Sequence, residues 1–140
     1  MGRILCATRG GEGSQPTLDG AIALAKERGD SLVFLFVADV SFLNQTAAPL
    51  VVDVELRLEH MGRFQLARAG ELATSQGVEA QTLVRRGRLR SELVAAAREV
   101  GATLIVLGRP TGQTAVFETE TLPAFAAALE AEAGIEVRIV

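Results

Sequence analysis

The chain has 140 residues, of which 49% are hydrophobic and 22% charged, with a mean hydropathy of +0.28, so it can form one apolar core and is not disordered. Its formal net charge of −3 and its 4% aromatic residues, all phenylalanine, argue against a nucleic-acid partner. One cysteine and one histidine exclude a disulfide framework and an ordinary zinc site. Because no apolar run is long enough to cross a bilayer and no signal peptide is evident, we expect a cytoplasmic protein without membrane contact.

Five short apolar segments predict β-strands. The segments at residues 4–7, 32–37 and 104–107 are continuously apolar, which is typical of strands covered on both faces. Residues 81–84 are more polar and indicate an edge strand. Residues 135–139 alternate strictly between apolar and charged side chains. This pattern is typical of a strand that has one face open to solvent or covered by a partner.

Between these strands, apolar residues recur at helical spacing and predict four helices. Ser14 or Thr17 is the expected cap of the first helix, and residues 39–52 carry no clear element, so they form either a lid or a disordered loop. The alternation predicts a single domain over residues 1–140, an α/β/α sandwich of three layers with a five-stranded, mainly parallel sheet. The four apolar stripes are Leu18, Ala21, Ile22 and Ala25; Val54, Leu58, Met61, Leu66, Ala69, Leu72 and Ala73; Leu93, Ala96, Ala97 and Val100; and Leu122, Phe125, Ala126, Leu129 and Ala133.

Two glycine-rich turns, residues 8–14 and 108–114, follow buried strands. Parallel strands end at one edge of a sheet, so both turns should lie at the rim where open α/β sheets bind ligands. The backbone N–H groups of such turns can hold an anion. Neither turn contains the Gly-Lys-Ser/Thr of a P-loop or the arrangement of a dinucleotide site.

Taken together, residues 3–14, 84–87, 92–97 and 101–108 resemble the universal stress protein family, and the resemblance extends from Arg3 to Val140. The most specific stretch is Gly-Ala-Thr-Leu-Ile-Val-Leu-Gly at residues 101–108, similar to the family's Ala-Asp-Leu-Ile-Val-Met-Gly. The resemblance implies an adenine-nucleotide alpha-hydrolase-like, flavodoxin-type sandwich with a regulatory role in stress response. It also implies an adenine nucleotide at the rim in many members, and homodimers whose last strands pair antiparallel.

The family's ATP-binding motif is degenerate in this chain. ATP-binding members have Gly-x2-Gly-x9-Gly-Ser/Thr after the fourth strand and an acid at the end of the first. Here three residues separate Gly108 from Gly112, the glycine-serine pair is absent, and Arg9 occupies the position of the acid. We therefore expect weak binding of ATP, ADP, AMP or another phosphorylated ligand.

The candidate ligand site has a phosphate side, an adenine side and two acidic neighbours. Glu118 and Glu120 would repel a phosphate unless an arginine intervened. Arg9 and Arg109 could bind a phosphate, which gives an altered anion site, or pair with these glutamates, which gives a plugged site. The phosphate side comprises Gly108, Arg109, Thr111, Gly112, Gln113, Thr114 and Arg9, and the adenine side comprises Ala7, Thr8 and Val37.

The remaining reactive residues favour structural roles. Cys6 indicates a buried, inert thiol, and His60 lies opposite the apolar stripe of its helix. The one basic cluster is interpreted as surface charge or, if it is functional, as facing an acidic partner or a phosphate at the rim. With no catalytic triad, P-loop or metal site, a binding protein is favoured over an enzyme, and slow ATP hydrolysis is a minor alternative. The basic cluster consists of Arg85, Arg86, Arg88 and Arg90.

The last strand predicts a homodimer. If two copies of this strand pair antiparallel about a two-fold axis at Val137, Glu136 of each chain lies opposite Arg138 of the other, which gives two opposite-charge pairs. Val140 lies on the same face of the strand and adds an apolar contact. The alternative is an edge strand that its charges protect from pairing. A dimeric interaction module that works without nucleotide is therefore the second functional hypothesis.

Overall fold

The computed structural model describes residues 2–8, 15–38, 48–108 and 122–140, in which strands and helices alternate along the chain. This alternation is the one that the apolar pattern predicts. The elements are β1 (Arg3–Thr8), α1 (Gln15–Arg28), β2 (Ser31–Ala38), α2 (Ala48–Ser75), β3 (Ala80–Arg86), α3 (Leu89–Val100), β4 (Leu104–Leu107), α4 (Leu122–Ala133) and β5 (Glu136–Ile139).

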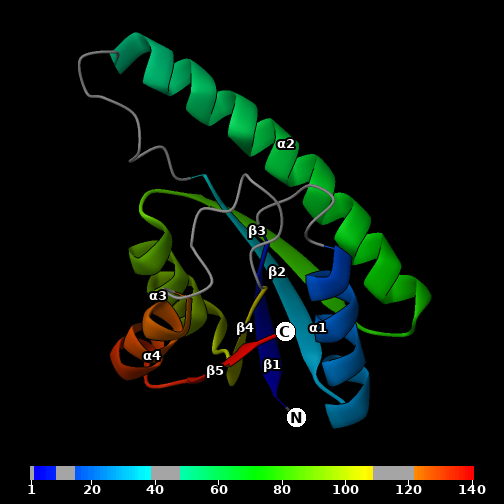
Figure 1. The fold of residues 1–140 in the computed structure, drawn as a ribbon. Helices are drawn as coiled ribbons and strands as arrows, with labels where there is room; N and C mark the ends of the chain where they lie inside the picture. The colour runs from blue at the N-terminus through cyan, green and yellow to red at the C-terminus, as the bar shows by residue number, and fades with distance from the viewer. Residues whose placement is uncertain (1, 9–14, 39–47, 109–121) are drawn as a thin grey trace.

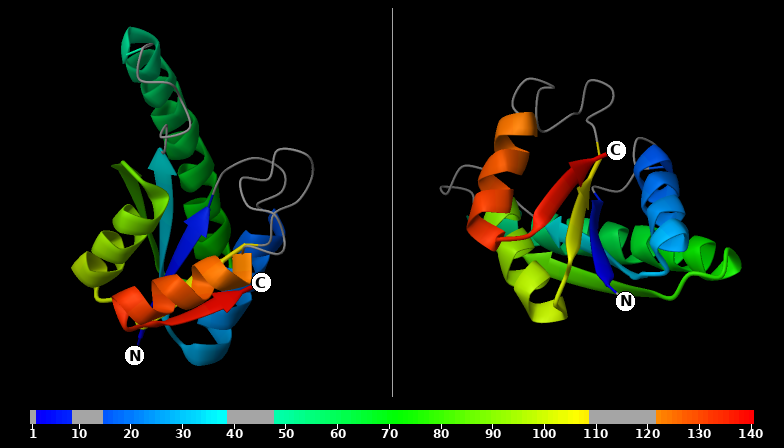
Figure 2. Two further views of the ribbon diagram at one scale, coloured as in Figure 1. Left: turned by 60° about the vertical axis from the view of Figure 1, so that its left-hand side comes forward. Right: turned by 90° about the horizontal axis from the view of Figure 1, so that it is seen from below.

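The sheet is parallel throughout, with the strand order β3-β2-β1-β4-β5. Helices α1 and α2 cover one face, and α3 and α4 cover the other (Figures 1 and 2). The more polar β3 and the alternating β5 are the two edges of the sheet, where a strand has a neighbour on one side only. The predicted three-layer sandwich is confirmed.

Each central strand sends alternate side chains into two separate cores, because successive residues of a strand point to opposite faces. Ile4 and Phe34 pack beneath α1 and α2, whereas Leu5 and Leu35 pack beneath α3 and α4. All of β4 is buried, since helices cover both of its faces. This double coverage explains why the central strands read as continuous apolar runs.

The apolar stripe predicted for α2 is only partly correct. Leu66, Ala69 and Ala73 are buried as expected, but Met61 is 59% exposed, so its assignment to the core was wrong. The row that faces the sheet continues instead at Gly62, which lies against the ring of Phe36. Glycine does not register as apolar in a hydropathy pattern, so the predicted stripe was drawn through the neighbouring Met61 instead of Gly62.

Two helix starts also differ from expectation. Helix α2 begins at Ala48, so the prediction that residues 48–52 form no helix or strand was wrong. Residues 39–47, and with them the choice between a lid and a disordered loop, lie outside the described residues. Helix α1 begins at Gln15, which places Thr17 within its first turn and rules it out as the cap. Across the described ranges, no helix combines the length and the apolar character that a membrane span requires.

Candidate functional site

The strand order places the topological switch point of the sheet between β1 and β4. From β1 the chain proceeds to β2 and β3 on one side, and then crosses to β4 on the other side of β1. Helix α1, which follows β1, and helix α4, which follows β4, lie on opposite faces of the sheet. The carboxyl ends of two such strands are the place where open α/β sheets bind ligands. Ala7 pairs with Leu107, which puts Thr8 and Gly108 side by side at the carboxyl ends of these two strands.

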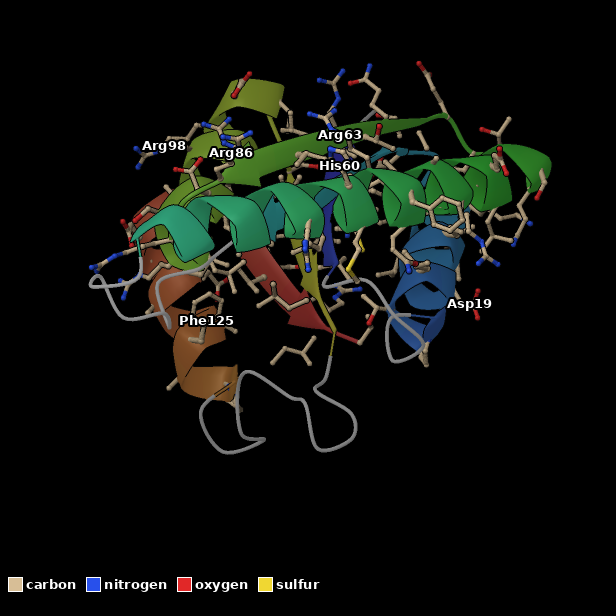
Figure 3. The ribbon with its side chains drawn as sticks, turned by 90° about the horizontal axis from the view of Figure 1, so that it is seen from above. Asp19, His60, Arg63, Arg86, Arg98 and Phe125 are labelled. Atoms are coloured by element: carbon tan, nitrogen blue, oxygen red, sulfur yellow. The ribbon has the colours of Figure 1, made fainter. Side chains whose placement is uncertain are left out.

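Four of the predicted site residues come together at this rim. Thr8 is beside Phe36, so Val37 lies one residue further toward the same edge, and Ala7 and Val37 both pack against the core beneath α3 and α4. Figure 3 looks onto this edge of the sheet, with Asp19 of α1 and Phe125 of α4 on opposite sides of it. The other candidates lie outside the described residues; they are Arg9, Arg109, Thr111, Gly112, Gln113, Thr114, Glu118 and Glu120.

Sequence reasoning missed one residue at this rim. Thr17 is only 4% exposed, and a Cβ added to Gly108 would lie 1.9 Å from its Oγ1, so a side chain directly after β4 would collide with Thr17. Helix α1 and β4 approach each other closely at this point. A signal for Thr17 exists, because it precedes the buried Ala21 by four residues and so shares the apolar face of α1.

The basic cluster is held largely by partners within the chain. Arg85 donates from Nε to Oε1 of Glu92 at 2.7 Å and also contacts Glu99, and the hydrogen bond to Glu92 is the main reason that the pKa of Arg85 is raised. Arg90 donates to Glu132 at 2.8 Å. Arg85 and Arg86 belong to β3 itself, because the strand runs two residues beyond the segment 81–84 in which it was expected. These pairs favour the interpretation as structural surface charge.

A depression of about 810 Å³ lies at the opposite, amino-terminal edge of the sheet. Several of its polar groups already have partners in the chain: the N–H of Gly2 donates to Asp30 at 2.8 Å, and Arg3 donates to the carbonyl of Val100 at 2.7 Å. Asp30 also pairs with Arg28 at 3.3 Å. The carboxyl-end rim is therefore the better candidate for a ligand site.

Cys6 and His60 have the environments that the sequence indicates. Cys6 is fully buried, and this burial raises the pKa of its thiol from 9.0 to about 12, which makes it a poor nucleophile. His60 is exposed on α2 (Figure 3). Within the described part of the chain, no three His, Cys, Asp or Glu side chains gather in a way that could hold a metal ion.

The charged pair predicted at the dimer interface lies on the exposed edge strand. Arg138 donates to Glu136 of the same chain at 3.2 Å, and both side chains are largely exposed. Val140 packs against Gly20 of α1, where a Cβ added to the glycine would lie 3.3 Å from Cβ of Val140. The exposed part of this face is therefore the charged pair rather than the terminal valine.

This fold defines a doubly wound α/β sandwich whose strand order 3-2-1-4-5 is of the Rossmann type and differs from the flavodoxin order 2-1-3-4-5, and proteins of known type share it. The profile of the Universal stress protein family matches residues 1–116. Universal stress protein YxiE of Bacillus subtilis (strain 168) is 32% identical over 114 residues, which cover 76% of this chain and 77% of the relative. The chain therefore belongs to the universal stress protein family.

Two solved structures extend this comparison. A protein of the universal stress protein family from Burkholderia pseudomallei is 26% identical, with a TM-score of 0.73, and covers 99% of this chain and 95% of its own. A universal stress protein in complex with cAMP is 21% identical, with a TM-score of 0.70, and covers 99% of this chain and 96% of its own. At this level of identity, the second structure supports the fold alone.

Proposed function

We propose that this universal stress protein binds an adenine nucleotide, or another phosphorylated small molecule, at the rim between β1 and β4. The observation that carries the proposal is the topological switch point between β1 and β4, where Thr8 ends β1 and Gly108 directly follows β4. The complex of a related protein with cAMP supports an adenine nucleotide as the ligand class. Ala7 and Val37 would contact the base, and Arg9, Arg109 and the turn at residues 108–114 would contact the phosphate.

Calorimetric titration of the protein with ATP, ADP and AMP tests this proposal. Because the glycine-serine pair of the family's ATP motif is absent, we expect binding of ATP to be less favourable than about −5 kcal/mol. Micromolar ATP binding would contradict a degenerate site. No detectable binding of any of the three nucleotides would overturn the proposal.

The same titration separates an altered anion site from a plugged one. In the plugged form, Glu118 and Glu120 pair with Arg9 or Arg109, so Glu118→Gln with Glu120→Gln should strengthen nucleotide binding by removing repulsion and releasing an arginine. Glu27→Gln with Glu130→Gln removes the same charge from two exposed sites elsewhere and serves as the control. Equal affinities of the two double variants would exclude the plug.

A dimeric interaction module is the second candidate function. It is favoured by one observation: β5 is an edge strand that exposes opposite charges at Glu136 and Arg138. An antiparallel pair of such strands would place each glutamate opposite the partner's arginine. Dimerisation through β5 and nucleotide binding at the rim are compatible, and each is tested separately.

A further inference from the structure

Two large apolar side chains are exposed together near the middle of α2. Met61 is 59% exposed and Phe64 is 63% exposed, and because three positions separate them they are neighbours on one face of the helix. Helix α2 packs on β2 and β3 through its opposite face, which includes the buried Leu66 and Ala73 (Figure 1). The exposed pair therefore points away from the core and contributes nothing to it.

Opposite charges flank this apolar pair on the same face of α2. Arg57 lies seven positions before Phe64 and Glu71 lies seven positions after it, and both side chains are exposed. Seven residues are close to two turns of an α-helix, so all three share one face. Arg57 also interacts within its own chain, but a guanidinium has five N–H donors and can bind a further carboxylate. The outer face of α2 comprises Arg57, Met61, Phe64, Ala67, Arg68 and Glu71.

This charge distribution makes the outer face complementary to itself. If two α2 helices pack antiparallel about a two-fold axis at Phe64, Arg57 of each chain lies opposite Glu71 of the other. Met61 of each chain then lies opposite Ala67, whose small side chain leaves room for the methionine. A second copy of the chain thus matches the face in both charge and size.

Other arrangements of the two helices bring like charges together. Parallel packing would place Arg57, Arg68 and Glu71 each opposite the same residue of the second chain. An antiparallel register that pairs Met61 with Phe64 would place Arg57 opposite Arg68. Repulsion of this kind selects against the wrong register, so the charges favour the arrangement with its axis at Phe64.

We propose that two copies of this chain associate through the outer faces of their α2 helices, packed antiparallel about Phe64. This contact is separate from the β5 dimer, because α2 packs on β2 and β3 while β5 is the far edge of the sheet. It also does not depend on a ligand at the rim. A face one helix wide belongs at the lower end of the size range of specific contacts, below about 1,200 Å², so the α2 contact is weaker than the β5 dimer and joins chains at higher concentration.

The test measures sedimentation of Glu136→Arg protein, in which the β5 dimer is weakened, at about 0.5 mM, where weak contacts of this size are populated. We expect association at this concentration. Adding Glu71→Arg should weaken it about tenfold, because two favourable pairs become two pairs of arginines, and adding Arg57→Glu as well should restore it. The matched control is Glu130→Arg, which makes the same charge change on the exposed part of α4. A Glu136→Arg protein that remains monomeric at this concentration overturns the α2 contact, and so do equal effects of Glu71→Arg and Glu130→Arg.

Removal of the central side chain supplies a second test. Phe64→Ser in the same Glu136→Arg protein should abolish the association, because it removes the apolar contact on the two-fold axis. Since Phe64 is 63% exposed and serine has a similar helix propensity, the melting temperature of the dilute, monomeric protein should stay unchanged. Association equal to that of the parent protein would overturn the proposal. A lower melting temperature of the dilute protein would also overturn it, because it would assign Phe64 to the stability of the single chain.

Discussion

Nε of Arg85 donates a hydrogen bond to Oε1 of Glu92 at 2.7 Å, and this contact ties the end of β3 to the first turn of α3. Both side chains are only about a quarter exposed, at 25% and 24%. Arg85 also contacts Glu99, which lies two turns further along the same face of α3. The three side chains hold the edge strand to the helix that covers it, across the turn at Gly87.

Replacing Arg85 should therefore destabilise the fold more than replacing a comparable surface arginine. Arg85→Met keeps the apolar stem but leaves two carboxylates without their partner, so we expect it to lower the free energy of unfolding by about 1.5–3 kcal/mol. Arg90→Met is the matched control, because the pair of Arg90 with Glu132 is 52% and 44% exposed and should contribute about 0–1 kcal/mol. Urea denaturation measures both values, and equal losses would contradict a special role for Arg85.

A close approach between α2 and β2 predicts opposite effects for two glycine substitutions in one helix. A Cβ added to Gly62 would lie 2.3 Å from the ring of Phe36, so Gly62→Ala should cost about 1–3 kcal/mol through overpacking. At Gly70 the nearest atom, Cγ2 of Thr82, would be 3.7 Å away, and Gly70→Ala should stabilise the helix by up to about 1 kcal/mol. Thermal melts of the two variants decide the matter, and a stabilising Gly62→Ala would show that Phe36 can move aside.

The buried thiol of Cys6 predicts a loss of stability in alkaline solution. Folding raises the pKa of this thiol from 9.0 to about 12, so between these values the unfolded chain releases the proton that the folded chain retains. The contribution of the neutral thiol is thus complete below about pH 9 and declines as the pH rises toward 12. Urea midpoints at about pH 8 and about pH 10.5 should fall more for the wild type than for Cys6→Ala, which lacks the titrating group. Parallel declines in the two proteins would assign the effect to other groups.

Charge reversal on β5 tests the dimer. With the two-fold axis at Val137, Glu136→Arg would set two like-charged pairs across the interface, each replacing a favourable pair that contributes roughly 0.2–1 kcal/mol. We expect sedimentation at micromolar concentration to show a dimer for the wild type, weaker association for Glu136→Arg and recovery when Arg138→Glu is added. A monomeric wild type would exclude the β5 dimer, and an unaffected Glu136→Arg dimer would place the interface elsewhere.

The sequence by itself determined the order of the elements, the buried strands and the two edges. These features follow from local periodicity: a strand covered on both faces, such as β4, has to be apolar at every position, and an edge strand such as β5 can alternate. The resemblance to universal stress proteins added the family. The parallel sheet then placed Ala7, Thr8, Val37 and Gly108 at one rim, because the carboxyl ends of parallel strands coincide.

Only the tertiary structure decided which distant residues meet. Thr17 and Gly108 are in contact although 91 positions separate them in the numbering, and the row of α2 that faces the sheet passes through Gly62 rather than Met61. The local sequence also does not distinguish Arg85 from the other arginines of the basic cluster, although Arg85 pairs with Glu92 and Glu99 of α3. The physical reason is that packing between layers depends on how the shapes of two surfaces fit together. The hydropathy pattern of the chain indicates only which side of each helix or strand is buried.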